Sequence, residues 1–210
     1  MPTLVIGSAE RLAALMAGVG RRWQPDLWEW PSRTAPNWSF YEVIVDLEAD
    51  ERPSPAFQLL PGQALWVFQS VRKPLAAILP DQRWWPRAVG VNLLPGFCER
   101  EVVEATALTT AAWERFKAWE PHSLRVPDQV GLVSARLLCL ILNEALWLAA
   151  EGGVSLETLD TAVQLGLNYP YTISQWGQRI GWSHVRAIVE ALQAEYGAGV
   201  YAVAPFLRAK

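Results

Sequence analysis

Short apolar runs bounded by turn residues dominate the first half of the chain. Each run is four to eight residues long, which is typical of buried β-strands and short for a helix. The first run leads directly into a stretch with helical spacing over residues 9–17, and a second helical stretch covers 109–119. The pattern therefore predicts a domain that mixes strands and helices. The predicted strands cover residues 3–7, 27–30, 41–47, 64–68 and 88–95.

The second half of the chain has apolar residues at helical spacing. Residues 131–151 predict one long helix that is apolar nearly all round, which is typical of a central, buried helix. Charged and amide side chains interrupt its apolar run well before membrane length. The pattern predicts an all-α unit. Its further helices are expected at 156–165, 172–180 and 184–196.

A stretch rich in proline and polar residues, 121–129, lies between the two patterns. Segments of this composition are typical of domain boundaries. We therefore expect an α/β domain over residues 1–120 and a helical domain over residues 121–210.

Composition narrows the functional classes. Charged residues make up 19% of the chain and the net charge is −3, with no basic cluster, so we expect neither nucleic acid nor a membrane as a partner. Cys98 and Cys139 lie in apolar surroundings, and their spacing predicts neither a metal site nor a disulfide. The first residues do not have the pattern of a signal peptide, so we expect a cytoplasmic protein. The 12 tryptophans indicate core or interface positions.

The segment from Val126 to Pro170, VPDQVGLVSARLLCLILNEALWLAAEGGVSLETLDTAVQLGLNYP, resembles the start of the helical C-terminal domain of 3-hydroxyacyl-CoA dehydrogenases. The resemblance implies a dinucleotide-binding first domain, NAD as the cofactor if the protein is active, and a homodimer formed through the helical domain. Trp147 and Trp176 are candidates for exposed aromatic residues of that interface. The matching positions are Asp128, Gly131, Arg136, Asn143, Glu144, Ala145, Glu151, Gly152, Asp160, Ala162, Gly166 and Pro170.

The opening strand, a glycine turn and a helix are typical of a Rossmann-like dinucleotide-binding unit. That turn has glycines at its first, third and sixth positions, where this chain has Gly7, Ala9 and Leu12. The first domain is therefore interpreted as a reduced Rossmann-like domain whose phosphate site is narrowed by side chains. Gly7, Ser8 and Asp50 are the candidate cofactor-binding residues.

The resemblance also locates the positions where the family's chemistry takes place. Asn92 lies where the family has its histidine general base, and Glu104 follows at the spacing of the glutamate that orients that base. An amide has no useful basicity near neutral pH, so Asn92 cannot take a hydroxyl proton. Ser70 is a candidate substrate contact, and Ala135 replaces the family's substrate-binding asparagine. If catalysis survives, Glu104 or Asp46 has to act as the base.

Three functional hypotheses follow. The first is a 3-hydroxyacyl-CoA dehydrogenase-like protein that has lost NAD-dependent chemistry and serves as a binding or assembly protein. The second is an active NAD-dependent oxidoreductase that acts on a 3-hydroxyacyl-CoA or a related hydroxy acid. The third is a non-catalytic binder that holds a small molecule in a cleft between the domains. No metal is expected in any of them.

Overall fold

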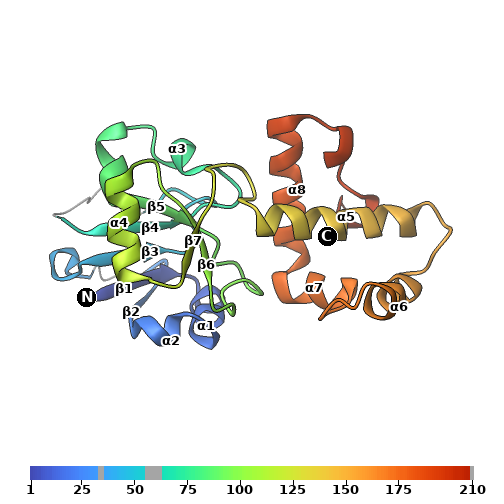
Figure 1. Ribbon diagram of the computed structural model, residues 1–210, viewed down its shortest axis with the longest axis horizontal. Coiled ribbons are helices and arrows are strands. Elements are labelled where there is room, and N and C mark those ends of the chain that lie inside the picture. Colours follow the sequence, from blue (N-terminus) through green and yellow to red (C-terminus); the bar gives the residue numbers. More distant parts are fainter. Residues whose placement is uncertain (33–35, 55–62, 209–210) are drawn as a thin grey trace. The chain divides into compact units, whose positions relative to one another are not determined.

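The computed structural model describes residues 1–32, 36–54 and 63–208. The chain forms two compact units, Met1–Leu132 and Val133–Lys210 (Figure 1). The first unit is a parallel α/β sheet of the Rossmann-like type and the second is helical, so the predicted fold class is confirmed.

The first unit is built on a seven-stranded sheet with the strand order β2-β1-β3-β4-β5-β6-β7. Neighbouring strands are parallel, except that β6 runs antiparallel to β5. The strands are β1 (Thr3–Gly7), β2 (Asp26–Glu29), β3 (Val43–Asp46), β4 (Leu65–Gln69), β5 (Ala88–Val91), β6 (Val103–Thr106) and β7 (Ser123–Arg125).

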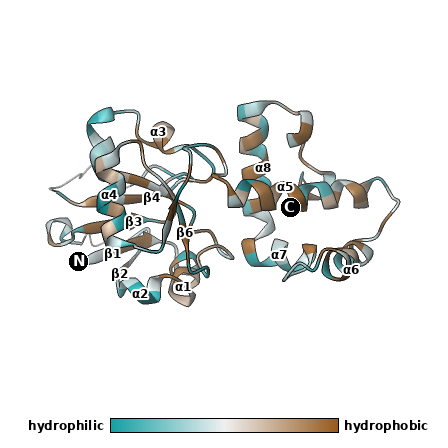
Figure 2. Cartoon of the chain, in the orientation of Figure 1, coloured by the Kyte–Doolittle hydropathy of each residue, from teal (hydrophilic) through white to brown (hydrophobic). Residues whose placement is uncertain are grey.

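Both faces of the central strands are covered, which explains why their sequences are apolar without alternation. In β1 the side chain of Val5 belongs to one core cluster, whereas Leu4 and Ile6 belong to the cluster on the opposite face. Figure 2 shows the central strands as predominantly hydrophobic ribbons. The helices of this unit are α1 (Ala9–Ala17), α2 (Gly20–Trp23), α3 (Leu75–Ile78) and α4 (Thr110–Trp119), with 3-10 turns η1 (Trp38–Phe40) and η3 (Gln82–Arg87).

The division between the units falls after Leu132, later in the sequence than the boundary expected at residue 120. The expected linker contains β7, which pairs with β6 and extends the sheet. Beyond β7, the Val126 N–H donates to the Ala105 carbonyl at 2.9 Å, and the Gly131 N–H donates to the Val71 carbonyl at 2.7 Å. These hydrogen bonds tie the segment to the sheet.

The second unit consists of α5 (Ser134–Ala150), α6 (Leu156–Gly166), α7 (Ile173–Ile180), α8 (Trp182–Tyr196), the 3-10 turn η4 (Gly199–Tyr201) and α9 (Pro205–Arg208). The central helix, α5, begins later than predicted because Gly131 and Leu132 have left-handed backbone conformations, with φ of 80° and 46°. Ser155 caps α6 by accepting the Thr158 N–H at 3.1 Å.

The helix α5 is buried on one face and exposed on the other, whereas its pattern suggested burial nearly all round. Leu138 and Leu142 are buried, but Leu137 is 59% exposed and Leu148 is 42% exposed. Trp176, expected at the surface, is buried. Within the described ranges, no helix has the length and apolar character needed to cross a membrane.

Candidate functional site

The candidate site lies at the carboxyl edge of the sheet, between β1 and β3. After β1 the chain moves outward to β2 and then returns to β3 on the other side of β1, so the direction of winding reverses at this point. In open α/β sheets the crevice at such a reversal is where ligands bind. Gly7 ends β1 and Asp46 ends β3, so the segments that follow these two residues line the crevice.

The turn after β1 leads directly into α1, and a carboxylate already lies at its N–H groups. The Ser8 N–H donates to Glu48 Oε1 at 3.2 Å, across 40 residues of sequence. Leu12, at the sixth position of the turn, is buried in the core beneath the helix. Gly7 packs closely against Leu47. A Cβ added to this glycine would lie 3.2 Å from Leu47 Cδ1. The turn therefore holds a side-chain anion where a dinucleotide-binding turn would approach a pyrophosphate.

Arg52 joins the two carboxylates that follow β3. It contacts Glu48 Oε2 and Asp46 Oδ1, each at 3.2 Å. Burial would raise the pKa of Glu48, but hydrogen bonds from Ser8 and the charge of Arg52 hold that pKa below its ordinary value. Burial raises the pKa of Asp46, and Arg52 and Ser54 oppose that rise. Asp46 is fully buried in this cluster, so it is poorly placed to meet a substrate proton.

Arg11 fills the space beside the turn. It is only 3% exposed, and it donates to Glu51 Oε1 at 3.1 Å and to the Leu93 carbonyl at 3.3 Å. Arg72 also contacts Glu51, at 3.4 Å. The three arginines of this edge, Arg11, Arg52 and Arg72, are therefore each paired with an internal carboxylate. The chain neutralises these cations itself.

Asp50 lies deeper at the same edge. Its Oδ2 accepts the N–H groups of Val71 and Arg72, both at 2.7 Å. Burial raises the pKa of Asp50 to about 6. The contacts of this carboxylate hold the turn after β4, and its role as a cofactor ligand stays a prediction.

Ser70 follows β4, Asn92 follows β5 and Glu104 lies at the start of β6. The structure thus brings these three residues together on neighbouring strands. The Ser70 N–H donates to the Val91 carbonyl at 3.0 Å, and the Asn92 N–H donates to the Glu104 carbonyl at 3.1 Å. Because β6 is antiparallel to β5, the start of β6 lies beside the carboxyl end of β5. This pairing explains how residues 12 positions apart meet.

The polar groups of these residues are largely used by the chain. The Ser70 hydroxyl donates to the Lys73 carbonyl at 2.9 Å. Asn92 is 3% exposed, and its Oδ1 accepts the Leu94 N–H at 3.3 Å. Glu104 is half-buried. Of these three side chains, only Glu104 carries a carboxylate, the type of group that serves as a general base in enzymes.

Sequence reasoning did not single out Glu48, Arg52 or Arg11. It also missed two polar residues that shape the edge, one buried and one half-buried. Gln69 Oε1 accepts the Leu93 N–H at 2.8 Å, and Asp128 accepts the N–H groups that begin α3. The sequence offered two signals. Gln69 directly follows a predicted strand, and Asp128 is one of the positions that match the family pattern.

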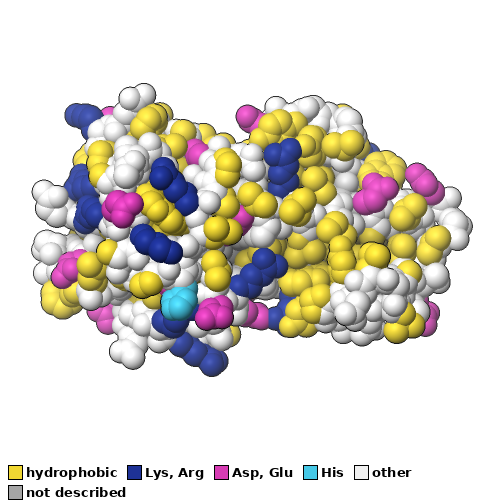
Figure 3. Space-filling view, in the orientation of Figure 1, with side chains coloured by type: hydrophobic (Ala, Val, Ile, Leu, Met, Phe, Trp, Pro, Cys, Tyr) yellow, Lys and Arg dark blue, Asp and Glu magenta, His cyan; other side chains and the backbone are white. Residues whose placement is uncertain are grey.

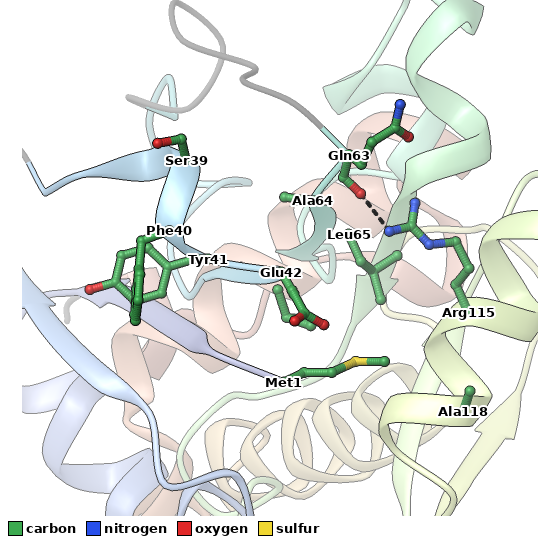
Figure 4. A pocket seen from close by; sticks show the side chains of 11 residues that line it. Met1, Ser39, Phe40, Tyr41, Glu42, Gln63, Ala64, Leu65, Arg115 and Ala118 are labelled. Atoms are coloured by element: carbon green, nitrogen blue, oxygen red, sulfur yellow. Dashed lines mark hydrogen bonds between the residues drawn. The ribbon is translucent and has the colours of Figure 1, made fainter.

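Two cavities lie away from this edge. One, of about 440 Å³, opens at the amino ends of β3 and β4, where Glu42, Leu65 and Arg115 line it (Figure 4). The other, of about 750 Å³, is an apolar groove on the helical unit between α5 and α6. Neither cavity includes a candidate site residue.

The helical unit matches a known family. The model of the 3-hydroxyacyl-CoA dehydrogenase C-terminal domain matches residues 131–210. The chain is 38% identical over 85 residues to 3-hydroxyadipyl-CoA dehydrogenase of Escherichia coli K12, across 40% of this chain and 18% of the relative. It is 37% identical over 82 residues to 3-hydroxybutyryl-CoA dehydrogenase of Clostridioides difficile, across 39% of this chain and 29% of the relative. The matched region thus spans less than a third of either relative.

Solved structures extend the likeness to both units at the level of the fold. FadB2 of M. tuberculosis superposes with a TM-score of 0.80 at 15% identity, covering 98% of this chain and 92% of that one. The (S)-3-hydroxybutyryl-CoA dehydrogenase of Ralstonia eutropha superposes with a TM-score of 0.73 at 16% identity, covering 100% of this chain and 93% of that one. The resemblance found in the sequence is confirmed.

Proposed function

The chain belongs to the 3-hydroxyacyl-CoA dehydrogenase family through its helical unit, and from this premise we propose that it has lost NAD-dependent dehydrogenase chemistry and serves as a binding or assembly protein. The chain shares its fold with dehydrogenases, but activity is determined by the residues of the site and not by the fold.

The observation that carries the proposal is Asn92. A dehydrogenase that oxidises a 3-hydroxyl needs a base at the hydroxyl, because the proton must leave as the hydride is transferred. By the sequence resemblance Asn92 takes the position of that base, but its amide oxygen accepts the Leu94 N–H and an amide cannot take a proton near neutral pH. Glu104 keeps its place beside Asn92. Without a base to orient, the half-buried carboxylate of Glu104 is simply a polar group at the carboxyl edge of the sheet.

The residues of the crevice do not fit a nicotinamide dinucleotide. A pyrophosphate needs free N–H groups at the start of α1 and a close backbone approach, which glycines provide. Here Glu48 accepts the Ser8 N–H, and Leu12 is part of the core. The proposed function therefore includes no reaction step that depends on a nicotinamide dinucleotide.

Two measurements on the full chain test the proposal. NADH binding is followed by fluorescence up to millimolar cofactor, and hydride transfer is followed at 340 nm with a 3-ketoacyl-CoA. We expect no saturable NADH binding and no turnover above background. Micromolar NADH affinity together with turnover would overturn the proposal.

The second candidate is an active NAD-dependent oxidoreductase acting on a 3-hydroxyacyl-CoA. The names of the matched relatives favour it, since both are dehydrogenases of hydroxyacyl-CoA substrates. Of the two candidate bases, Glu104 and Asp46, Glu104 is the one whose backbone is hydrogen-bonded to Asn92, so in this case it would have to act as the base. Glu104→Gln would then abolish turnover.

We also propose that the helical unit forms a homodimer through the exposed face of α5. Leu137, Ile141 and Leu148 on this face line the apolar groove, together with residues of α6. An exposed apolar surface of this kind is typical of an interaction site. Figure 3 shows hydrophobic side chains gathered over this unit.

Sedimentation at micromolar concentration tests the dimer. Leu137→Glu places a charge in the groove and should shift the chain to the monomer. Leu165→Glu is the control, because Leu165 is 80% exposed and does not line the groove. A wild-type monomer, or equal masses for both variants, would contradict the proposal.

A further inference from the structure

We propose that Glu48 is an internal ligand of the crevice, and that its carboxylate occupies the anion position at the start of α1 and excludes ligands bearing a phosphate or pyrophosphate. Glu48 then determines which ligands the crevice rejects, whether or not the dehydrogenase chemistry is lost.

The first support is the position of the carboxylate. The helix α1 has nine residues and follows β1 at the winding reversal of the sheet. N–H groups at a helix start attract anions, because they have no partner within the helix and lie at the positive end of its dipole. The hydroxyl of Ser8 makes no capping hydrogen bond. Instead, the Ser8 N–H donates to Glu48 Oε1 at 3.2 Å, so an anion from the chain itself lies at the helix start.

The second support is the way Glu48 is held. Arg52, four residues later, donates to Glu48 Oε2 through both Nε and Nη2. The same guanidinium contacts Asp46 at the end of β3 and lies 5.4 Å from the ring centre of Trp30. Arg52 is thus anchored on both sides of the crevice, and it keeps the Glu48 carboxylate directed at Ser8.

The third support is a buried donor that the internal carboxylates leave unused. Arg11 belongs to the first turn of α1 and is almost fully buried. Its Nη1 and Nη2 donate to Glu51 and to the Leu93 carbonyl, whereas its Nε has no hydrogen-bond acceptor among the described residues. A buried guanidinium N–H without an acceptor is costly. The edge therefore retains one guanidinium N–H that no internal carboxylate among the described residues uses.

The charges explain why an external phosphate is rejected. A phosphate that approached Ser8 would have to displace Glu48 from the N–H and from Arg52, and it would then lie close to the displaced carboxylate. Because the pKa of Glu48 lies below its ordinary value, the carboxylate stays charged at neutral pH. Removing this side chain frees the Ser8 N–H and leaves Arg52 with one carboxylate partner instead of two.

The experiment measures the binding of inorganic pyrophosphate by calorimetry at low ionic strength, on the full-length chain. Wild type, Glu48→Ala and Glu48→Gln are compared with the control Glu42→Ala. Glu42 is an exposed carboxylate at the opposite edge, so this control removes the same charge and leaves the crevice intact. Thermal unfolding establishes that each protein is folded.

We expect Glu48→Ala to bind pyrophosphate at least tenfold more tightly than the wild type and Glu42→Ala do, with a gain that falls as salt is raised. Glu48→Gln should show a smaller gain, because its amide oxygen can still accept the Ser8 N–H. Equal affinity of the wild type and a folded Glu48 variant would overturn the inference. If Glu48→Ala does not fold, the same criterion applies to Glu48→Gln.

The result is independent of the proposed loss of activity. A wild type that turns over 3-ketoacyl-CoA overturns the proposed function, whatever the pyrophosphate affinities are. A Glu48 variant without any gain in pyrophosphate binding overturns the internal ligand, even if the wild type is inactive.

Discussion

The carboxylate of Asp50 accepts the backbone N–H of Val71 at 2.7 Å and thereby ties the segment after β3 to the turn after β4. The same oxygen accepts the Arg72 N–H, whereas Oδ1 has no hydrogen-bond partner among the described residues. One oxygen of this buried group is satisfied and the other is not. This arrangement has consequences for the dependence of stability on pH.

Asp50 should make the protein less stable as the pH rises from about 4 to about 7. Its pKa in the folded state is raised from 3.8 to about 6, so the folded protein binds the proton more tightly than the unfolded chain does. The stabilisation is complete below the unfolded pKa and is lost as the pH rises through 6. Two pKa units correspond to about 3 kcal/mol at most. Urea unfolding of the wild type and Asp50→Asn at pH 4, 5, 6 and 7 measures the difference.

In Asp50→Asn the amide oxygen can still accept both N–H groups, but this residue no longer titrates. The unfolding free energy of the wild type relative to Asp50→Asn should therefore fall across this pH range. Glu42→Gln, an exposed substitution, is the control and should follow the wild type. Parallel pH profiles for the wild type and Asp50→Asn would show that the carboxylate does not titrate in this window.

Restoring the base alone should not restore activity. Asn92→His supplies an imidazole at the base position, but Glu48 still occupies the start of α1. We expect hydride transfer from NADH to a 3-ketoacyl-CoA only in the double variant Asn92→His/Glu48→Ala, and at a low rate because Leu12 remains. Absorbance at 340 nm is the readout. Equal turnover by the Asn92→His single variant would show that the carboxylate does not block the cofactor.

Asn143 should be a major stabilising residue of the helical unit. It is buried on α5, where its Oδ1 accepts the Ala204 N–H and its Nδ2 donates to the Ala202 carbonyl, both at 2.9 Å. Asn143→Ala leaves the Ala204 N–H without its partner, and we expect a loss of about 2–4 kcal/mol. Chemical unfolding checks the value. Gln164→Ala, an exposed position on α6, should change stability by about 0.5 kcal/mol or less.

Gly177 should tolerate no side chain. It lies in α7, and a Cβ there would be 2.0 Å from Cζ2 of Trp182, whose ring packs edge-on against Phe206. The ring cannot move without disturbing this contact, so Gly177→Ala should cost about 2–4 kcal/mol. Gly153→Ala is the matched comparison, because no atom lies within 4 Å of its added Cβ. Thermal unfolding should separate the two variants by several degrees, and similar midpoints would contradict the packing argument.

The strands β1 to β5 could be predicted from the sequence because local pattern and tertiary environment agree, whereas β6 and β7 were not predicted. The run that forms β1 is apolar at every position, and both faces of β1 are covered in the structure. The strand β7 was missed because it has three residues, two of them polar, and is defined only by its pairing with β6. The exposed face of α5 was missed because an apolar residue contributes to the hydrophobic pattern in the same way whether its position is exposed or buried.

The sequence by itself determined the strands β1 to β5, the helical unit and the replacement of a basic histidine by Asn92, because these depend on residue type and on short-range spacing. It also indicated that Glu104 would meet Asn92. Only the tertiary structure decided what lies in the crevice. The contact between Glu48 and Ser8 joins residues 40 positions apart, and it exists because the winding reversal places the ends of β1 and β3 side by side. No local pattern records such a contact, since its energy depends on the fold that brings a carboxylate to a helix start.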